Sequence, residues 1–177
     1  MRKIVVKKLN KDKKTTSSKR KVVMVSGGFD PIHIGHVRYI QEAKKLGDYL
    51  VVVLNNDNWL RKKKGKEFMK ESDRKEIIEA ISGVDKVVIS RHEKNPKDMS
   101  ISRELIRIKP DVFASGGDRN KKDAADPLSS LYTDLRACEK VGTQIVFNVG
   151  HGGKVRSSSE LVKSYSNHLK KHVDKKN

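Results

Sequence analysis

Short, β-branched apolar runs alternate with helical patterns along most of this 177-residue chain. Apolar runs predict strands near residues 22–26, 50–54, 86–90, 111–114 and 144–148. Helical periodicity predicts helices near residues 35–46, 72–82, 100–108, 128–141 and 158–172. This alternation predicts an α/β fold: one doubly wound, Rossmann-like, five-stranded parallel sheet with helices on both faces. Ligands of such folds bind at the carboxyl ends of the strands.

Positive charge is concentrated at the two ends of the chain. The formal net charge is +18, of which residues 1–21 supply +9 and residues 163–177 supply +4. We therefore expect a flexible basic leader over residues 1–21, one domain over residues 22–173 and a basic tail over residues 174–177. An enzyme with basic ends explains this distribution better than a basic binding face does, although the ends are expected to bind polyanions weakly.

The chain contains neither a disulfide framework nor a membrane-spanning pattern. Cys138 is the only cysteine, and its helical register predicts a buried, small apolar residue. No apolar run approaches the ~20 residues of a membrane span, and no signal-peptide apolar region follows the basic start. We expect a cytoplasmic protein without membrane association. A targeting role for the Lys-rich start is the alternative.

A glycine-rich turn follows the first predicted strand and leads into the first predicted helix. It reads Gly27-Gly28-Phe29-Asp30 and continues to His33-x-Gly35-His36. Backbone N–H groups and the positive end of a helix dipole meet at such a turn, which makes it an anion site. Two imidazoles at the start of the helix add hydrogen-bond donors for phosphate oxygens. A metal-binding pair or two surface histidines are the alternatives.

Three later segments follow predicted strand ends and suit phosphate or hydroxyl groups. Residues 61–64 are four consecutive cations, predicted as a mobile loop that closes over phosphates; a solvated charge run is the alternative. Gly116-Gly117-Asp118 forms a glycine turn with an acidic acceptor, or an ordinary Asx turn. Ser157-Ser158-Ser159 opens the last helix as an anion nest, and Ser157 with Glu160 also fits a capping box. Ser72 and Asp73 fit the capped start of the helix predicted near residues 72–82.

These motifs, in this order, resemble the cytidylyltransferase-like nucleotidyltransferases, whose signature is His-x-Gly-His. The resemblance covers residues 22 to about 163. Within the family, the chain looks most like the adenylyltransferase domain of bacterial ADP-heptose synthases. It is also similar to glycerol-3-phosphate and ethanolamine-phosphate cytidylyltransferases. Family members are doubly wound α/β domains, usually dimers, that join a nucleoside triphosphate to a phosphorylated acceptor and release pyrophosphate.

The resemblance implies roles for particular residues. His33, His36 and Lys64 are the implied catalytic residues, with Lys64 reaching the triphosphate. Implied nucleotide-binding residues are Gly27, Gly28, Phe29, Asp30, Gly35, Asp57, Arg74, Gly116, Gly117, Asp118, Ser157, Ser158 and Ser159. Arg74 matches an arginine that either supports the site or contacts substrate. Many relatives carry an arginine where this chain has Val162; Arg156 or Lys163 is expected to compensate.

The expected reaction is direct in-line attack of an acceptor phosphate oxygen on the α-phosphorus of ATP or CTP. A sugar phosphate such as a heptose phosphate is the favoured acceptor, with glycerol 3-phosphate or an amino-alcohol phosphate as the alternative. Mg²⁺ is expected to arrive on the nucleotide, because the chain has no carboxylate cluster for a metal site of its own. A catalytically inactive, basic nucleic-acid-binding protein is the more distant alternative. A homodimer is expected from the resemblance.

Overall fold

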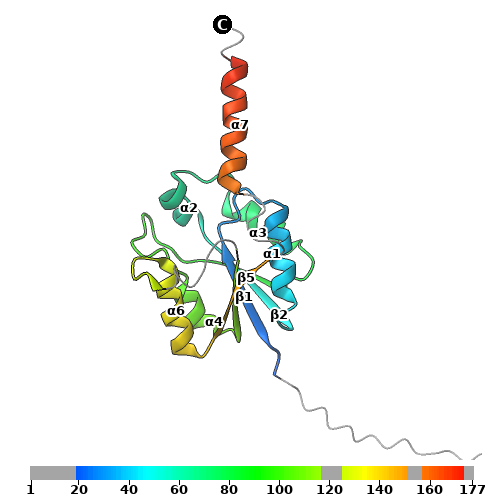
Figure 1. Cartoon of the computed structure of the whole chain (residues 1–177), viewed down its shortest axis with the longest axis vertical. Helices are drawn as coiled ribbons and strands as arrows, with labels where there is room; N and C mark the ends of the chain where they lie inside the picture. Colours follow the sequence, from blue (N-terminus) through cyan, green and yellow to red (C-terminus); the bar gives the residue numbers. More distant parts are fainter. Residues whose placement is uncertain (1–18, 117–124, 151–156, 174–177) are drawn as a thin grey trace, which may run out of the picture.

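The computed structural model describes residues 19–116, 125–150 and 157–173. Its centre is a five-stranded, wholly parallel sheet in the order β3-β2-β1-β4-β5 (Figure 1). The strands are β1 (Val22–Gly27), β2 (Tyr49–Leu54), β3 (Lys86–Ile89), β4 (Val112–Gly116) and β5 (Gln144–Val149). The predicted doubly wound α/β fold is confirmed.

Helices cover both faces of the sheet. They are α1 (Ile34–Lys44), α2 (Asp57–Lys64), α3 (Glu71–Glu79), α4 (Ser102–Ile108), α6 (Ser130–Val141) and α7 (Ser158–Val173). One core cluster joins α1 and α3 to the sheet through Ile40 and Ile78, and a second joins α4 and α6 through Leu105 and Leu131. Successive strand residues point to opposite faces, so Val23 and Val25 enter the first cluster and Met24 the second.

The four cations at residues 61–64 belong to helix α2, so the predicted mobile loop is wrong. Asn56 caps this helix by accepting a hydrogen bond from the Trp59 backbone N–H at 3.0 Å. Trp59 and Leu60 are buried and anchor the helix, while the first three cations extend to the surface and Lys64 reaches back to Asp30. Gly65, at φ 83°, ends it. A capped helix with a buried anchor fixes where each cation lies.

The start of α3 also differs from the expectation. The helix begins at Glu71, and Lys70 occupies the N-cap position without a side-chain cap. The Ser72 hydroxyl donates to Asp73 instead. The Glu71 carboxylate accepts a hydrogen bond from the Asp57 backbone N–H at 2.8 Å, so the first turn of α3 is joined to the first turn of α2.

Cys138 is buried in α6, as predicted, and burial raises the pKa of its thiol to about 12. Before β1, the backbone of Lys21 already belongs to the body: its N–H donates to Asp48, and its carbonyl accepts from the backbone N–H groups of Asp48 and Tyr49. None of the described helices is long and apolar enough to cross a membrane.

Candidate active site

A cavity of about 190 Å³ lies at the carboxyl edge of the sheet, over the end of β1. In the strand order, the chain leaves β1 for β2 on one side and returns to β4 on the other. Such a switch point is where open α/β sheets bind ligands. The cavity is lined by Ser26, Gly27, Gly28, Tyr39, Asn55, Trp59, Phe113, Ser115 and Gly116. Three predicted glycines, Gly27, Gly28 and Gly116, therefore share one cavity.

His33 and His36 form the N-terminal cap of α1. The Gly35 backbone N–H donates to Nδ1 of His33 at 3.1 Å, and the His33 backbone N–H donates to Nδ1 of His36 at 3.3 Å. The two rings stack with centroids 3.8 Å apart. Because each Nδ1 accepts a hydrogen bond, a neutral ring carries its proton on Nε2. The cap thus fixes two imidazoles as Nε2–H donors.

His36 is held neutral by its surroundings. Burial, with the neighbouring His33 and the Lys64 ammonium, lowers the pKa of His36 to about 3. The edge of its ring meets the buried Phe29 ring, with centroids 5.1 Å apart. Phe29, at φ 49°, also covers Gly27, where a Cβ would lie 3.0 Å from the ring. Phe29 therefore supports His36 from below and does not line the cavity.

Lys64 lies at the end of α2 and points to the loop before α1. Its Nζ donates to the Asp30 carbonyl oxygen at 2.6 Å. Burial lowers the pKa of Lys64, with Arg74 acting in the same direction and Asp30 opposing it. The buried Asp30 carboxylate accepts from the backbone N–H groups of Phe68 and Met69, so it holds the segment between α2 and α3. Helix geometry therefore places a full cation, Lys64, near the imidazoles.

Arg74 is fully buried and supports the site from beneath. Its guanidinium donates to the carbonyl oxygens of Met69, Gly28 and Asn55 at 3.0, 2.7 and 2.8 Å. It also pairs with the Asp57 carboxylate at 2.6 Å. Of the two expectations for Arg74, this geometry favours structural support, and it gives Asp57 the same role.

The start of α7 meets the start of α1. The Ser158 hydroxyl donates to the Pro31 carbonyl oxygen at 3.0 Å, although the two residues are far apart in sequence. The Ser157 hydroxyl accepts from the Glu160 backbone N–H at 3.5 Å, a long capping contact. Ser159 is exposed. Two helix N-termini therefore converge beside the histidines, an arrangement suited to a polyanion. Gly117, Asp118 and Arg156 lie outside the described residues.

Sequence reasoning missed six of the nine residues that line the cavity, Tyr39 and Asn55 among them. Tyr39 extends from α1, and its hydroxyl donates to the Ala114 carbonyl oxygen at 2.6 Å. Its ring occupies the space of a Cβ at Gly116, at 2.5 Å, so only glycine fits there. Asn55 follows β2 and donates its backbone N–H to Gly27. A polar residue directly after a buried strand was the available signal for Asn55, while Tyr39 gave only a helical apolar position.

The described side chains do not form a magnesium site. No group of three or more His, Cys, Asp or Glu among them is arranged to hold a metal ion. The carboxylates of Asp30, before α1, and of Asp57, at the start of α2, already accept backbone and guanidinium donors. What converges beside the cavity is hydrogen-bond donors, which suit phosphate oxygens rather than Mg²⁺.

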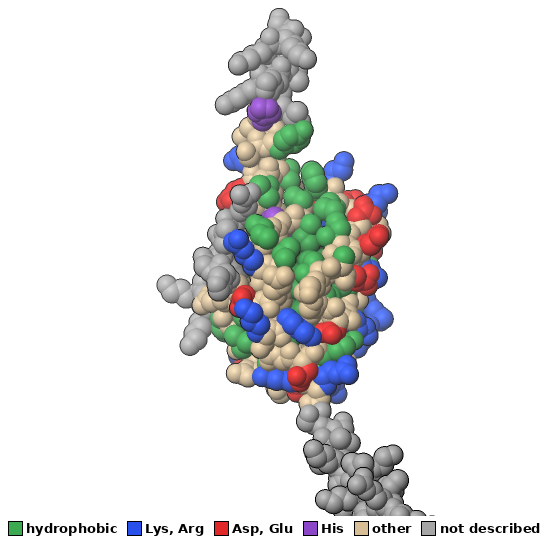
Figure 2. Space-filling view, turned by 90° about the vertical axis from the view of Figure 1, so that its right-hand side faces the viewer, with side chains coloured by type: hydrophobic (Ala, Val, Ile, Leu, Met, Phe, Trp, Pro, Cys, Tyr) green, Lys and Arg blue, Asp and Glu red, His purple; other side chains and the backbone are tan. Residues whose placement is uncertain are grey.

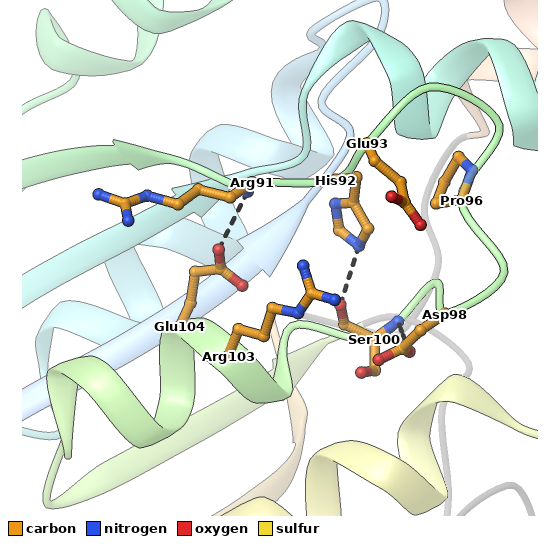
Figure 3. Close-up of a pocket in the computed structure, with 8 residues that line it drawn as sticks. All are labelled: Arg91, His92, Glu93, Pro96, Asp98, Ser100, Arg103 and Glu104. Atoms are coloured by element: carbon orange, nitrogen blue, oxygen red, sulfur yellow. Dashed lines mark hydrogen bonds between the residues drawn. The ribbon is translucent and has the colours of Figure 1, made fainter.

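A second pocket lies beyond β3 and is a structural seam (Figure 3). It encloses only about 20 Å³, room for about one water. The His92 ring is hydrogen-bonded to the Ser90 hydroxyl. Figure 3 shows its second bond, to the Ser100 carbonyl oxygen, and the bond from the Arg91 backbone N–H to Glu104. The His92 carbonyl oxygen accepts from the Asn56 amide at 2.8 Å. This seam braces the start of α2.

Comparison with known proteins agrees with this geometry. The Cytidylyltransferase-like family matches residues 24–163. The FAD synthase of Pyrococcus horikoshii is 44% identical over 106 residues, covering 58% of this chain and 68% of the relative. The FAD synthase of Ferroglobus placidus is 42% identical over 100 residues, 56% of this chain and 61% of the relative. The bifunctional protein HldE of Wolinella succinogenes is 40% identical over 130 residues, 72% of this chain but only 26% of that protein.

Solved structures show the same fold. The lipopolysaccharide core biosynthesis protein of Thermoplasma volcanium is 27% identical, with a TM-score of 0.58 over 75% of this chain and 98% of that one. Thermotoga maritima TmcAL, solved with α-thio ATP, has a TM-score of 0.63 at 13% identity. The match covers 84% of this chain and 51% of the TmcAL chain. At that identity the likeness concerns the fold alone.

Proposed function

Because this chain belongs to the Cytidylyltransferase-like family of nucleotidyltransferases, we propose that it transfers adenylate from ATP to a sugar phosphate and releases pyrophosphate. The observation that carries the proposal is the convergence of two helix N-termini on a pair of imidazoles with fixed Nε2–H donors. ATP is favoured over CTP because the relatives include FAD synthases and HldE, an ADP-heptose synthase, and the product of each contains an ADP moiety.

The proposed chemistry is one in-line displacement. An oxygen of the acceptor phosphate attacks the α-phosphorus, the bond from that phosphorus to the β-phosphate oxygen breaks, and pyrophosphate leaves with the electron pair. The nucleophile is already an anion, so no covalent enzyme intermediate is required. The chain then has to orient the phosphates and stabilise the charge that develops on them.

The described residues divide that work. The Nε2–H groups of His33 and His36 donate to phosphate oxygens, and the low pKa of His36 keeps that ring a neutral donor. Lys64 supplies the full positive charge after leaving the Asp30 carbonyl. The first turn of α7, with Ser157 and Ser158, receives the distal phosphates. Mg²⁺, typical of the family, is proposed to arrive with the nucleotide and to neutralise its phosphates.

The first test separates the role of His36 as a donor from its role as a cap. Glutamine at this helical position can still accept from the His33 backbone N–H, as in an ordinary capping box. We expect His36→Gln to retain the unfolding midpoint and to lose about 10²–10³ in kcat, as for removal of one preorganised donor. His36→Ala should lose both activity and a cap. A His36→Gln enzyme above a tenth of wild-type turnover would refute the catalytic assignment.

Flavin mononucleotide is the second candidate acceptor, because FAD synthases are among the relatives at 42% and 44% identity. A pyrophosphate-release assay with ATP, CTP, GTP and UTP decides among the candidates. The acceptor panel is heptose 1-phosphate, glycerol 3-phosphate, ethanolamine phosphate and flavin mononucleotide. Mass spectrometry of the product identifies both substrates. Pyrophosphate release from ATP with the sugar phosphate alone supports the proposal, and turnover with flavin mononucleotide alone replaces it.

We also propose that the enzyme works as a homodimer. Figure 2 shows apolar side chains gathered on the face that carries α1 and α3. Exposed large apolar residues include Ile34 in α1, Ile77 in α3, and Val162 and Tyr165 in α7. An apolar surface of this kind marks an interaction site more often than free surface. Light scattering should give twice the chain mass, and Ile77→Glu should shift it toward the single chain.

A further inference from the structure

Asn55 carries a side-chain acceptor that no group in the described part of the chain binds. The residue is only 5% exposed, yet its side-chain oxygen Oδ1 is buried without a hydrogen-bond partner. It is the one such side-chain atom within the described part of the chain. A buried acceptor left unpaired is costly in a folded protein, and native structures contain few of them. This one lines the cavity at the switch point of the sheet.

The two residues that follow Asn55 do have partners for their side chains. Asn56 caps α2 through its oxygen and donates its amide to the His92 carbonyl. Asp57 pairs with Arg74. Three consecutive polar residues thus follow β2, and the side chains of the second and third are bound by protein groups. Of the three, only Asn55 has a buried side-chain acceptor without a partner among the described residues, and Asn55 also lines the cavity.

We propose that the carboxamide oxygen of Asn55 accepts a hydrogen bond from a hydroxyl group of a substrate. This inference rests on the proposed function, because it assigns the cavity to the substrates of that reaction. The hydroxyl belongs either to the ribose of the nucleotide or to the polyol of the acceptor, since both carry the same donor.

The lining of the cavity favours a hydroxyl over other donors. An acceptor oxygen does not bind phosphate, which offers no donor when ionised. No acidic residue is among the described lining residues, so a substrate ammonium would enter without a counter-charge. Ser26 and Ser115, which can donate and accept, lie on the same wall, and the buried Trp59 contributes an aromatic surface. Neutral polar groups beside an aromatic ring suit a polyhydroxylated ligand.

Two variants with the same chemical change test the proposal. Asn55→Leu removes the unpaired oxygen, so the free protein should unfold at an equal or higher temperature. Asn56→Leu removes a fully bonded amide and should lower the unfolding temperature. If Asn55→Leu instead destabilises the free protein as Asn56→Leu does, the side chain is structural and the proposal is overturned. Asn55→Ala repeats the comparison should leucine not fit.

Binding measurements locate the hydroxyl. If it is ribosyl, Asn55→Leu weakens ATP binding in calorimetry by about threefold to tenfold, and removes the preference for ATP over 2′-deoxy-ATP or 3′-deoxy-ATP. If it belongs to the acceptor, the ATP Kd is unchanged and the KM of the acceptor rises by a similar factor. Unchanged values for every substrate overturn the proposal. A loss of preference for ATP over ITP, with the deoxy analogues unaffected, would assign Asn55 to the base and overturn it as well.

Failure of the proposed function and failure of the inference about Asn55 can be told apart. If the wild-type protein releases pyrophosphate from no nucleotide, the proposed function fails. Asn55 is then judged by the unfolding temperatures and by calorimetry with ATP and with the acceptor panel, and Kd values that are unchanged for all of them in Asn55→Leu count against it. If turnover is found and Asn55→Leu behaves as wild type throughout, only the present inference fails.

Discussion

Replacing Arg74 should lower the free energy of unfolding, because Arg74 joins the segments beneath the candidate site. In the folded protein, its guanidinium donates to three carbonyl oxygens and one carboxylate, at 2.6 to 3.0 Å. Arg74→Ala removes all of these bonds together, leaves a void, and deprives Asp57 of its cation. Removing one partner of a buried ion pair costs about 3–5 kcal/mol, and Asp57 is 15% exposed, which lowers its share. We expect a loss of about 3–4 kcal/mol in the free energy of unfolding.

Urea denaturation followed by circular dichroism measures this loss, and the adjacent Lys75→Ala is the matched control. The Lys75 side chain is 38% exposed and pairs with Glu79 one turn away, so its removal should cost no more than about 0.5 kcal/mol. Arg74→Lys keeps the charge but not the planar fork, and should fall between the two. The reasoning is refuted if Arg74→Ala stays within about 1 kcal/mol of wild type while its turnover collapses, because Arg74 would then act on the substrate.

Three further outcomes are expected. Lys64→Ala should lose about 10²–10³ in kcat, whereas Lys62→Ala, which loses only a bond to Asn95, should stay near wild type; equal small effects would mean a solvated charge run. The free energy of unfolding should decrease as the pH falls from 6.5 toward 3, because unfolded His36 takes up a proton that the folded protein excludes. His36 contributes at most about 1.4 kcal/mol per pH unit to this slope, so the slope should be smaller in His36→Gln. An equal slope in both proteins would contradict the assigned pKa. Removing residues 1–18, which hold seven of the forty Lys and Arg residues, should preserve kcat/KM and lower the salt needed for elution from heparin; a large drop in kcat/KM would place the leader in the active site or the dimer.

The fold was predictable because its signals are local and repeated. Each strand is a short apolar run and most helices have an apolar face, so their order alone indicates a parallel sheet. Helix α2 was not predicted, because its buried residues are a single adjacent pair, Trp59 and Leu60, followed by four cations. Asn56 was the available start signal, but a lone Asn after a strand equally marks a turn.

The positions of His33 and His36 were predictable from the sequence, whereas the contacts of the residues beneath them were not. A glycine turn between strand and helix places His33 and His36 by local geometry. The role of Arg74 depends on carbonyl oxygens of two different strand ends, which no spacing along the chain reveals. Asn55, Asn56 and Asp57 are alike as sequence, and they differ only in which partners the tertiary structure brings to them.

The contacts of Asp30 suggest how the free site is kept ready. Its carbonyl oxygen accepts Lys64, and its carboxylate accepts the backbone of Phe68 and Met69. Asp30, in the loop before α1, therefore holds both the end of α2 and the segment that leads to α3. The Lys64 ammonium is already partly desolvated in this position, which is why burial lowers its pKa. Transfer of Lys64 from a neutral carbonyl to a phosphate oxygen replaces a weak partner with a charged one. That exchange gains most where negative charge is greatest, so Lys64 should stabilise the departing pyrophosphate more than the bound triphosphate, and its loss should lower kcat rather than raise KM.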